Sequence, residues 1–193
     1  MRTAKIERKT KETEISVEIN IEGTGKTDIE TSVPFLDHML NLFSFHGALD
    51  LTIRGKGDIE IDYHHLIEDM GITMGEAIRK AVGDKKGIRR YGNATVPMDE
   101  TLAQVVLDLS GRPYLVYKVT DQGRVKDLDV ALFEEFFRAL SVHAGMNLHI
   151  IVHYGRDLHH IIEGIFKAFG RALREAVSLD TRMAGLPSTK GSL

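Results

Sequence analysis

The segment His64-His65-Leu66-Ile67-Glu68 decides the organisation of the chain, because it occurs twice. Its second copy is His159-His160-Ile161-Ile162-Glu163, at an offset of 95 residues (159 − 64). The match continues downstream at the same offset, where 75–82 corresponds to 170–177, and upstream at an offset of 97, where 45–53 corresponds to 142–150. A weaker match joins Glu12-Thr13 to Glu100-Thr101. A self-match of this length indicates a duplicated supersecondary unit.

Each half has the same predicted order of elements: strand, helix, strand and long helix. Strands are predicted where apolar residues alternate with polar ones, and helices where apolar residues recur at spacings of three and four. The expected strands are 14–19, 49–54, 103–109 and 148–153, and the expected helices are 34–45, 63–82, 128–142 and 157–177. The fold class is therefore α+β, with one half in residues 1–91 and the other in residues 92–193.

The composition describes a globular protein with a small-molecule partner. The 193 residues are 42% hydrophobic, enough for one substantial core or two small halves packed together. A net charge of −3 without long charged runs argues against nucleic-acid and membrane-surface binding. There is no cysteine, and neither a signal peptide nor an apolar membrane span is evident. We therefore expect a cytoplasmic location.

The duplicated histidines indicate metal binding. On a helix, Glu68 shares a face with His64 and His65, and Glu163 has the same relation to its own pair. Adjacent histidines point about 100° apart, so one pair does not easily serve one ion. The simplest arrangement is two ions, with each helix supplying ligands to both. Imidazole with carboxylate suits Mn, Fe, Co, Ni or Zn better than Ca or Mg alone.

Other histidines are related by the repeat as well. His38 is equivalent to Glu135, and both residue types ligate metals, although an exposed helix position explains either equally well. For His46 and its equivalent His143, a packed or hydrogen-bonded role is favoured. His149 and His153 alternate along a strand and are expected to be structural.

Several cations suggest an anionic substrate. Arg112 directly follows an apolar strand, and Lys167 lies one helical turn beyond Glu163. The tail 186–191 combines hydroxyl groups with Lys190, a pairing suited to a phosphate or a carboxylate. Each of these features alone is more often solvated surface.

The chain resembles the imidazoleglycerol-phosphate dehydratase family over essentially its whole length. The resemblance is carried by several long motifs in the same order: 34–40, 62–69, 107–113, 159–163, 166–169 and 187–191. It implies a duplicated fold like the second domain of ribosomal protein S5. It also implies a homo-oligomer of 24 subunits, with sites containing two Mn(II) ions between subunits.

The resemblance also implies roles for individual residues. The implied metal ligands are His38, His64, His65, Glu68, Glu135, His159, His160 and Glu163. The implied substrate-binding residues are Glu12, His46, Arg90, Arg112, Lys167, Ser188 and Lys190. The expected catalytic residues are Glu12, His64, Glu68 and Glu163, with Glu12 as the candidate for proton transfer. Some relatives have His at the position of Glu135.

The implied reaction is loss of water from imidazole glycerol phosphate to give imidazole acetol phosphate. The proton to be removed lies on a carbon with no adjacent carbonyl group, and two cations that bind the imidazole ring would stabilise its negative charge. Two other functions fit the residues alone. One is a two-metal phosphohydrolase, which would release inorganic phosphate. The other is a metal-binding assembly protein without enzymatic activity.

Overall fold

The computed structural model describes residues 2–182 and 185–191 of the chain. Each half contains a four-stranded sheet and two helices, and a small two-stranded hairpin lies in the second half. The first half contains β1 (Thr3–Lys9), β2 (Thr13–Asn20), β3 (Thr27–Glu30), α1 (Pro34–Gly47), β4 (Asp50–Gly57) and α2 (His64–Val82). The second contains β5 (Tyr91–Met98), β6 (Thr101–Asp108), β7 (Tyr114–Lys118), β8 (Arg124–Val125), β9 (Leu128–Asp129), α3 (Leu132–Ala144), β10 (Asn147–Tyr154) and α4 (Leu158–Val177).

The two large sheets have the same topology, which confirms the expected duplicated α+β fold. Their strand orders are β1-β2-β4-β3 and β5-β6-β10-β7. In each sheet the first three strands are antiparallel neighbours, and the fourth strand pairs in parallel with its neighbour. β2 buries every second residue, as the alternation in its sequence predicts.

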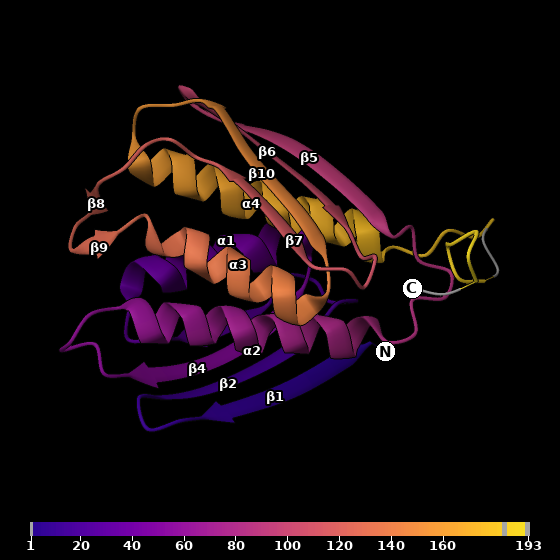
Figure 1. Cartoon of the computed structure of the whole chain (residues 1–193), viewed down its shortest axis with the longest axis horizontal. Helices are drawn as coiled ribbons and strands as arrows, with labels where there is room; N and C mark the ends of the chain where they lie inside the picture. The colour runs from indigo at the N-terminus through magenta and orange to yellow at the C-terminus, as the bar shows by residue number, and fades with distance from the viewer. Residues whose placement is uncertain (1, 183–184, 192–193) are drawn as a thin grey trace.

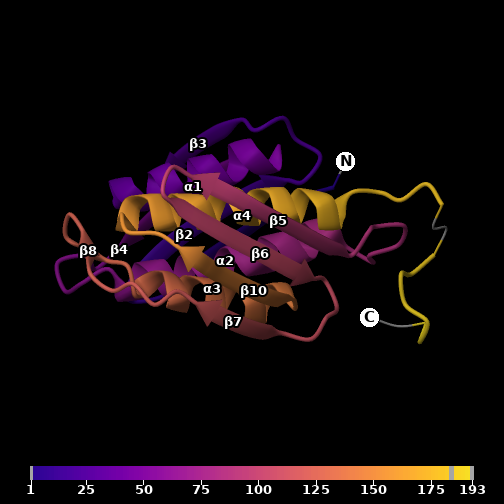
Figure 2. The same ribbon diagram turned by 90° about the horizontal axis from the view of Figure 1, so that it is seen from above.

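The two sheets form the outer layers of the molecule, and the four helices lie between them (Figure 1). α1 and α2 cover the first sheet, and α3 and α4 cover the second. The helix layers then pack against each other, α2 on α3 and α1 on α4. The view from above shows the tail after α4 running away from the body (Figure 2).

The strands that the sequence analysis did not predict are mostly polar edge strands. β1, β3, β5 and β7 lie at the sheet edges, and only one of the four residues of β3 is even half-buried. β3 therefore shows almost no alternation, whereas β1 and β5 alternate in burial but hold small residues such as Ala4, Gly92 and Ala94 at inward positions, which give a weak hydrophobic signal. One boundary prediction was wrong: the helix expected from Leu128 begins at Leu132, because Leu128 and Asp129 pair with β8. The boundary of the halves at residues 91 and 92 remains a prediction.

One hydrophobic core runs through both halves. Its largest fully buried side chains include six phenylalanines, and Phe43 of α1 stacks on Phe169 of α4 with ring centroids 5.0 Å apart. Phe133, Phe137 and Phe166 continue this aromatic cluster between α3 and α4. The helix layers are therefore joined by aromatic packing, which fixes the halves relative to each other.

Two glycines related by the duplication allow the helices to approach closely. A Cβ on Gly75 would lie 2.7 Å from the carbonyl oxygen of Leu140, and a Cβ on Gly170 would lie 2.4 Å from that of Phe43. The glycines are 95 residues apart, and the residues that they meet are 97 apart, as in the sequence match. The same crossing therefore occurs at both helix pairs.

None of the helices in the described part of the chain is long and apolar enough to cross a membrane.

Replacement of Gly170 by Ala tests this crossing. Alanine has the higher helix propensity, by about 1 kcal/mol, so an uncrowded site would be stabilised. Here the added methyl group meets backbone, and we expect a loss of roughly 1–3 kcal/mol, a fall of about 2–10 °C in the thermal midpoint of the metal-free protein. The matched control is Gly185→Ala, since a Cβ at Gly185 meets nothing within 4 Å. An unchanged or raised midpoint for Gly170→Ala would contradict the close crossing.

Candidate metal centre

The two histidine pairs sit in the first turn of the two long helices. The backbone N–H of His64 donates to Asp62 Oδ1 at 2.7 Å, and that of His159 donates to Asp157 Oδ1 at 2.8 Å. Aspartate before a helix satisfies N–H groups that have no partner within the helix. The same aspartate contact occurs in both halves, and each histidine pair lies in the first turn, although α2 begins at His64 itself and α4 begins one residue before His159.

Two groups of candidate metal ligands come together among the described residues, His38 with His159 and Glu163, and Glu12 with Asp58 and His65; the first consists of predicted ligands alone. His38 Nε2 lies 3.4 Å from Glu163 Oε2, and His159 Nε2 lies 3.2 Å from the same oxygen. His38 belongs to α1, and the other two belong to α4. The Phe35 ring packs edge-on against the His159 ring, with centroids 5.1 Å apart, and so limits its movement. Two imidazole nitrogens and a carboxylate therefore converge on one point.

Lys167 lies beside this group, as expected from its position one turn after Glu163. Its Nζ is 2.6 Å from Glu163 Oε1, and both side chains are largely buried. Burial acts to raise the pKa of Glu163, but the Lys167 ammonium and His38 outweigh it and leave that pKa below its usual range. Glu163 is therefore held as a carboxylate, the form that ligates a metal.

The corresponding residues of the first half are more open. His64 Nε2 lies 3.6 Å from Glu68 Oε2, and both side chains are more than 40% exposed. Glu135 of α3, the repeat equivalent of His38, forms an ion pair with Arg138 at 3.5 Å. The structure therefore places His64 with Glu68 but brings Glu135 into no contact with them among the described residues.

The second histidine of each pair points elsewhere. The rings of His64 and His65 are 6.2 Å apart at an interplanar angle of 89°, and those of His159 and His160 are 6.3 Å apart at 78°. His65 Nδ1 is 3.0 Å from Asp58 Oδ2 and 4.0 Å from Glu12 Oε2. The predicted divergence of adjacent histidines is thus present in both halves.

Two carboxylates in contact with these histidines were missed from the sequence. They are Asp58, beside His65, and Glu100, whose Oε2 lies 2.8 Å from His160 Nδ1. Hydrogen bonds to Asp58 and to Glu100 raise the pKa of His65 and of His160, respectively. Glu100 was noticed as the repeat equivalent of Glu12, and that match was the available signal. Asp58 is one of several acids in its loop, and nothing in the sequence distinguishes it.

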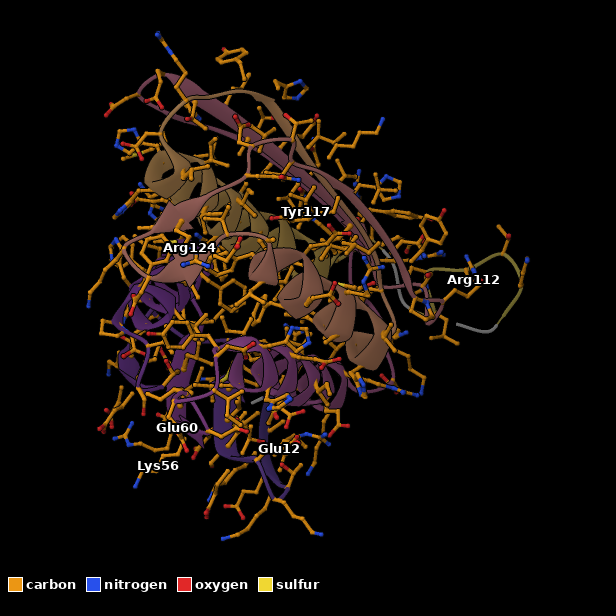
Figure 3. The ribbon with its side chains drawn as sticks, turned by 60° about the vertical axis from the view of Figure 1, so that its left-hand side comes forward. Glu12, Lys56, Glu60, Arg112, Tyr117 and Arg124 are labelled. Atoms are coloured by element: carbon orange, nitrogen blue, oxygen red, sulfur yellow. The ribbon has the colours of Figure 1, made fainter. Side chains whose placement is uncertain are left out.

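The expected phosphate-binding residues lie at the other end of α4. The backbone N–H of Arg90 donates to the carbonyl of Ala176, 13 residues after Glu163 (176 − 163). At 1.5 Å per residue this is about 20 Å along the helix. Arg112 follows β6 at this same end, since Asp108 of β6 pairs with Tyr91. Figure 3 shows Glu12 and Arg112 in separate parts of the molecule.

Arg90 and the tail are bound to each other. Arg90 donates through Nε and Nη2 to both oxygens of Asp108, at 2.6 and 3.0 Å, and through Nη1 to the carbonyl of Pro187 at 2.8 Å. The backbone N–H of Lys190 donates to Ser188 Oγ at 3.2 Å. Arg90 thus fixes the base of the tail, and two of its five N–H groups remain for a ligand.

His46 lies at the end of α1, beside the basic side of α4. Burial first, and then the charges of Lys167 and Arg171, lower the pKa of His46. A neutral imidazole is therefore favoured there. Its repeat equivalent His143 lies 3.2 Å from Glu76, in the hydrogen-bonded arrangement expected of it. His153, which was expected to be structural, lies 3.0 Å from Gln104 at the surface.

The donor atoms fit a transition metal ion. Nitrogen and carboxylate donors from His38, His159 and Glu163 lie within 4.8 Å of one another, and no thiolate is present in the chain. This set suits Mn, Fe, Co, Ni or Zn. A hydrogen-bonded Nδ1 on His65 and on His160 leaves Nε2 of each ring available as a further ligand.

The fold and this site together define a metal-dependent enzyme built from a duplicated α+β unit. Comparison with known proteins identifies which one. The sequence profile of the imidazoleglycerol-phosphate dehydratase family matches residues 31–173. The chain is 58% identical to the imidazoleglycerol-phosphate dehydratase of Thermodesulfovibrio yellowstonii, over 99% of both chains, and 56% identical to that of Syntrophus aciditrophicus, over 100% and 99%.

Solved structures agree with the sequence comparison. The dehydratase of Staphylococcus aureus superposes with a TM-score of 0.83 at 41% identity, covering 92% of this chain and 99% of that one. The enzyme of Pyrococcus furiosus superposes with a TM-score of 0.85 at 39% identity, covering 97% and 100%. The chain therefore belongs to the imidazoleglycerol-phosphate dehydratase family and is a hydro-lyase of histidine biosynthesis. This confirms the resemblance seen in the sequence.

The ion pair of Lys167 with Glu163 predicts a pH-dependent effect on stability. Because the folded-state pKa of Glu163 is lowered, its charge adds stability above its unfolded value of about 4.3, and this is lost as the pH falls through the folded value. In Lys167→Met, burial would instead favour the neutral acid. We expect the metal-free variant to be less stable than the parent at pH 7, and the difference in thermal midpoint to shrink as the pH falls below about 4.

The matched control is Arg171→Met, which removes an exposed cation one turn further along α4. A stability difference for Lys167→Met that stays constant from pH 7 to pH 3 would show that the ion pair does not hold the charge of Glu163.

Proposed function

We propose that the chain removes water from imidazole glycerol phosphate to give imidazole acetol phosphate, at a site that holds two Mn(II) ions and that is completed only when copies of the chain assemble. The reaction takes a proton from one carbon and hydroxide from the neighbouring carbon that carries the ring, and the enol that results becomes the ketone. The observation that carries the proposal is the convergence of His38, His159 and Glu163, with His160 directed away from them.

The proposed metal ligands fall into groups that face different directions. Within one chain the first group is His38, His159 and Glu163, and the second is His64 and Glu68, to which the duplication adds Glu135. His65 and His160 diverge from both groups, so we assign them to ions held by neighbouring copies. The full set is His38, His64, His65, Glu68, Glu135, His159, His160 and Glu163. A divalent transition metal there would act as a Lewis acid that stabilises negative charge on the substrate ring.

Glu12 is the proposed group for proton transfer. Its side chain is 55% exposed and its Oε2 is 4.0 Å from His65 Nδ1, beyond hydrogen-bonding distance. A carboxylate free of strong partners, beside a metal ligand, is available to accept a proton from a bound substrate. Lys167, already paired with Glu163, and the neutral His46 would contact the substrate from the side of α4.

The phosphate group would be bound by Arg90, Arg112, Ser188 and Lys190. These residues combine guanidinium, ammonium and hydroxyl donors, which is the chemistry that phosphate oxygens require. They lie about 20 Å along α4 from Glu163, whereas the substrate is a short molecule. We therefore infer that the phosphate of a substrate at one copy's metal centre is bound by another copy.

The proposal also includes the number of subunits and the location of the enzyme. A closed homo-oligomer supplies every site with the same neighbours, and 24 subunits is the size that the family resemblance implies. A biosynthetic enzyme with a phosphorylated small-molecule substrate is expected in the cytoplasm, and we include that location.

Chelation tests the proposed function. The purified protein should contain about two Mn(II) ions per chain, in line with the two groups of ligands. Treatment with a chelator should remove the dehydration of imidazole glycerol phosphate, and Mn(II) should restore it. Release of inorganic phosphate instead would identify a phosphohydrolase. Full activity in metal-free protein would refute the proposal.

The variant Glu12→Gln separates metal binding from proton transfer. It keeps every proposed ligand, so its Mn(II) content should equal that of the parent, while turnover should fall by roughly 100-fold or more. Near-normal turnover with normal metal content would remove Glu12 from the mechanism.

A further inference from the structure

In the second half of the chain, Glu100 holds the ring of His160 in one orientation. Glu100 Oε2 lies 2.8 Å from His160 Nδ1, and Glu100 Oε1 accepts the backbone N–H of Asp157 at 2.9 Å. A weaker bond from the backbone N–H of Arg156, at 3.3 Å, reaches the same oxygen. With Oε1 occupied by two backbone N–H donors, Glu100 presents Oε2 to the ring as a hydrogen-bond acceptor, so His160 Nδ1 is the donor.

In the first half, Asp58 has the same relation to His65. Its two oxygens lie 3.0 and 3.2 Å from His65 Nδ1, and its side chain is 18% exposed. Because a carboxylate accepts hydrogen bonds, Nδ1 of His65 is again the protonated nitrogen. In both halves, therefore, the carboxylate occupies Nδ1, and Nε2 is the ring nitrogen left for a metal.

The two carboxylates are not repeat equivalents. β2 and β6 correspond at an offset of 88 (101 − 13), which pairs Glu12 with Glu100. β4 and β10 correspond at an offset of 97 where they begin (147 − 50), but β10 has a register shift between Val152 and Tyr154, so the offset beyond it is 98 and Asp58 corresponds to Arg156. The second half therefore has a basic residue, and no carboxylate, at the position of Asp58. The second histidine of each pair is thus held by a carboxylate in both halves, but the two carboxylates come from different positions of the repeated unit.

We propose that Asp58 and Glu100 are positioning residues that fix the tautomer and direction of His65 and His160, and that Asp58, by taking this role in the first half, leaves Glu12 free. Glu100 uses both of its oxygens in hydrogen bonds, whereas its equivalent Glu12 stays 4.0 Å from the ring and exposed. A duplicated carboxylate is therefore structural in one half and available for chemistry in the other. The inference rests on the proposed metal-binding role of both histidines.

Amide variants of the two carboxylates give the sharpest test, because they change hydrogen-bond polarity and little else. In Glu100→Gln the amide oxygen can still accept from the backbone of Asp157, while the amide nitrogen faces the ring and donates to it. His160 would then carry its proton on Nε2, the nitrogen that should bind the metal. In Asp58→Asn a neutral amide replaces the charged acceptor of His65, so the hydrogen bond that holds His65 Nδ1 is weakened or reversed. The matched control is Glu60→Gln, which removes an exposed carboxylate close to Asp58 in sequence that has no hydrogen bond or ion pair among the described residues.

The measurement is a titration of the full-length, assembled protein with Mn(II), in which free ion is counted by electron paramagnetic resonance. In each amide variant we expect about half of the bound ions to be held roughly 10- to 100-fold more weakly than in the parent, the usual effect of losing a hydrogen-bond partner of a ligand histidine. The thermal midpoint of the metal-free variants should stay close to that of the parent, whereas the rise on adding Mn(II) should shrink. The Glu60→Gln control should match the parent in both respects.

The outcomes are distinguishable. If Glu100→Gln and Asp58→Asn bind Mn(II) as tightly as the parent, the positioning role is wrong and the metal centre stands. A lower midpoint of the metal-free variants with unchanged Mn(II) affinity would assign the two carboxylates a structural role only, and would overturn the inference as well. If the parent itself binds no Mn(II), the proposed function fails first.

Discussion

A rigid helix keeps apart two groups of residues that the proposed reaction requires together. α4 carries His159 and Glu163 in its first two turns, and the residues proposed to bind phosphate lie beyond its last turn. A helix neither shortens nor bends enough to remove about 20 Å of separation. The helix also turns adjacent histidines about 100° apart, so that each pair faces two directions. Under the proposed function, both constraints have the same consequence: one chain holds parts of several sites and no complete one, so that activity would require assembly.

The duplication explains how one chain provides two histidine pairs on equivalent helices. The same sheet order, the same aspartate cap and the same glycine crossing occur in both halves, and they place two histidine pairs at equivalent points. What surrounds the pairs has diverged. The group at His159 is closed by the buried Glu163 and Lys167, whereas that at His64 is open to solvent. The scaffold is therefore symmetric, whereas the surroundings of the two histidine pairs are not, and the two proposed ions would differ in their environments.

The sequence predicted the elements that have a local pattern, but it did not predict the side-chain contacts that depend on how distant segments pack. The helices with His64 and His159, the central strands and the family were predicted, because periodicity and motifs are local. The convergence of His38 with His159 depends on how α1 packs on α4, and only the family resemblance named both residues as ligands. Asp58 was not predicted, since its role follows from the direction in which β4 ends. Edge strands such as β3 were missed because they bury little.

The sharing of sites between copies is tested most directly by mixing two inactive variants. His159→Ala removes a metal ligand, and Arg112→Ala removes an exposed cation from the opposite end of the molecule. Each variant alone should assemble and be nearly inactive. When the two are dissociated together and reassembled with Mn(II), sites that combine an intact metal group from one copy with an intact phosphate group from another should recover up to roughly a quarter of the parent activity, if pairing is random. A mixture that assembles fully and stays as inactive as its components would show that each chain forms its site alone.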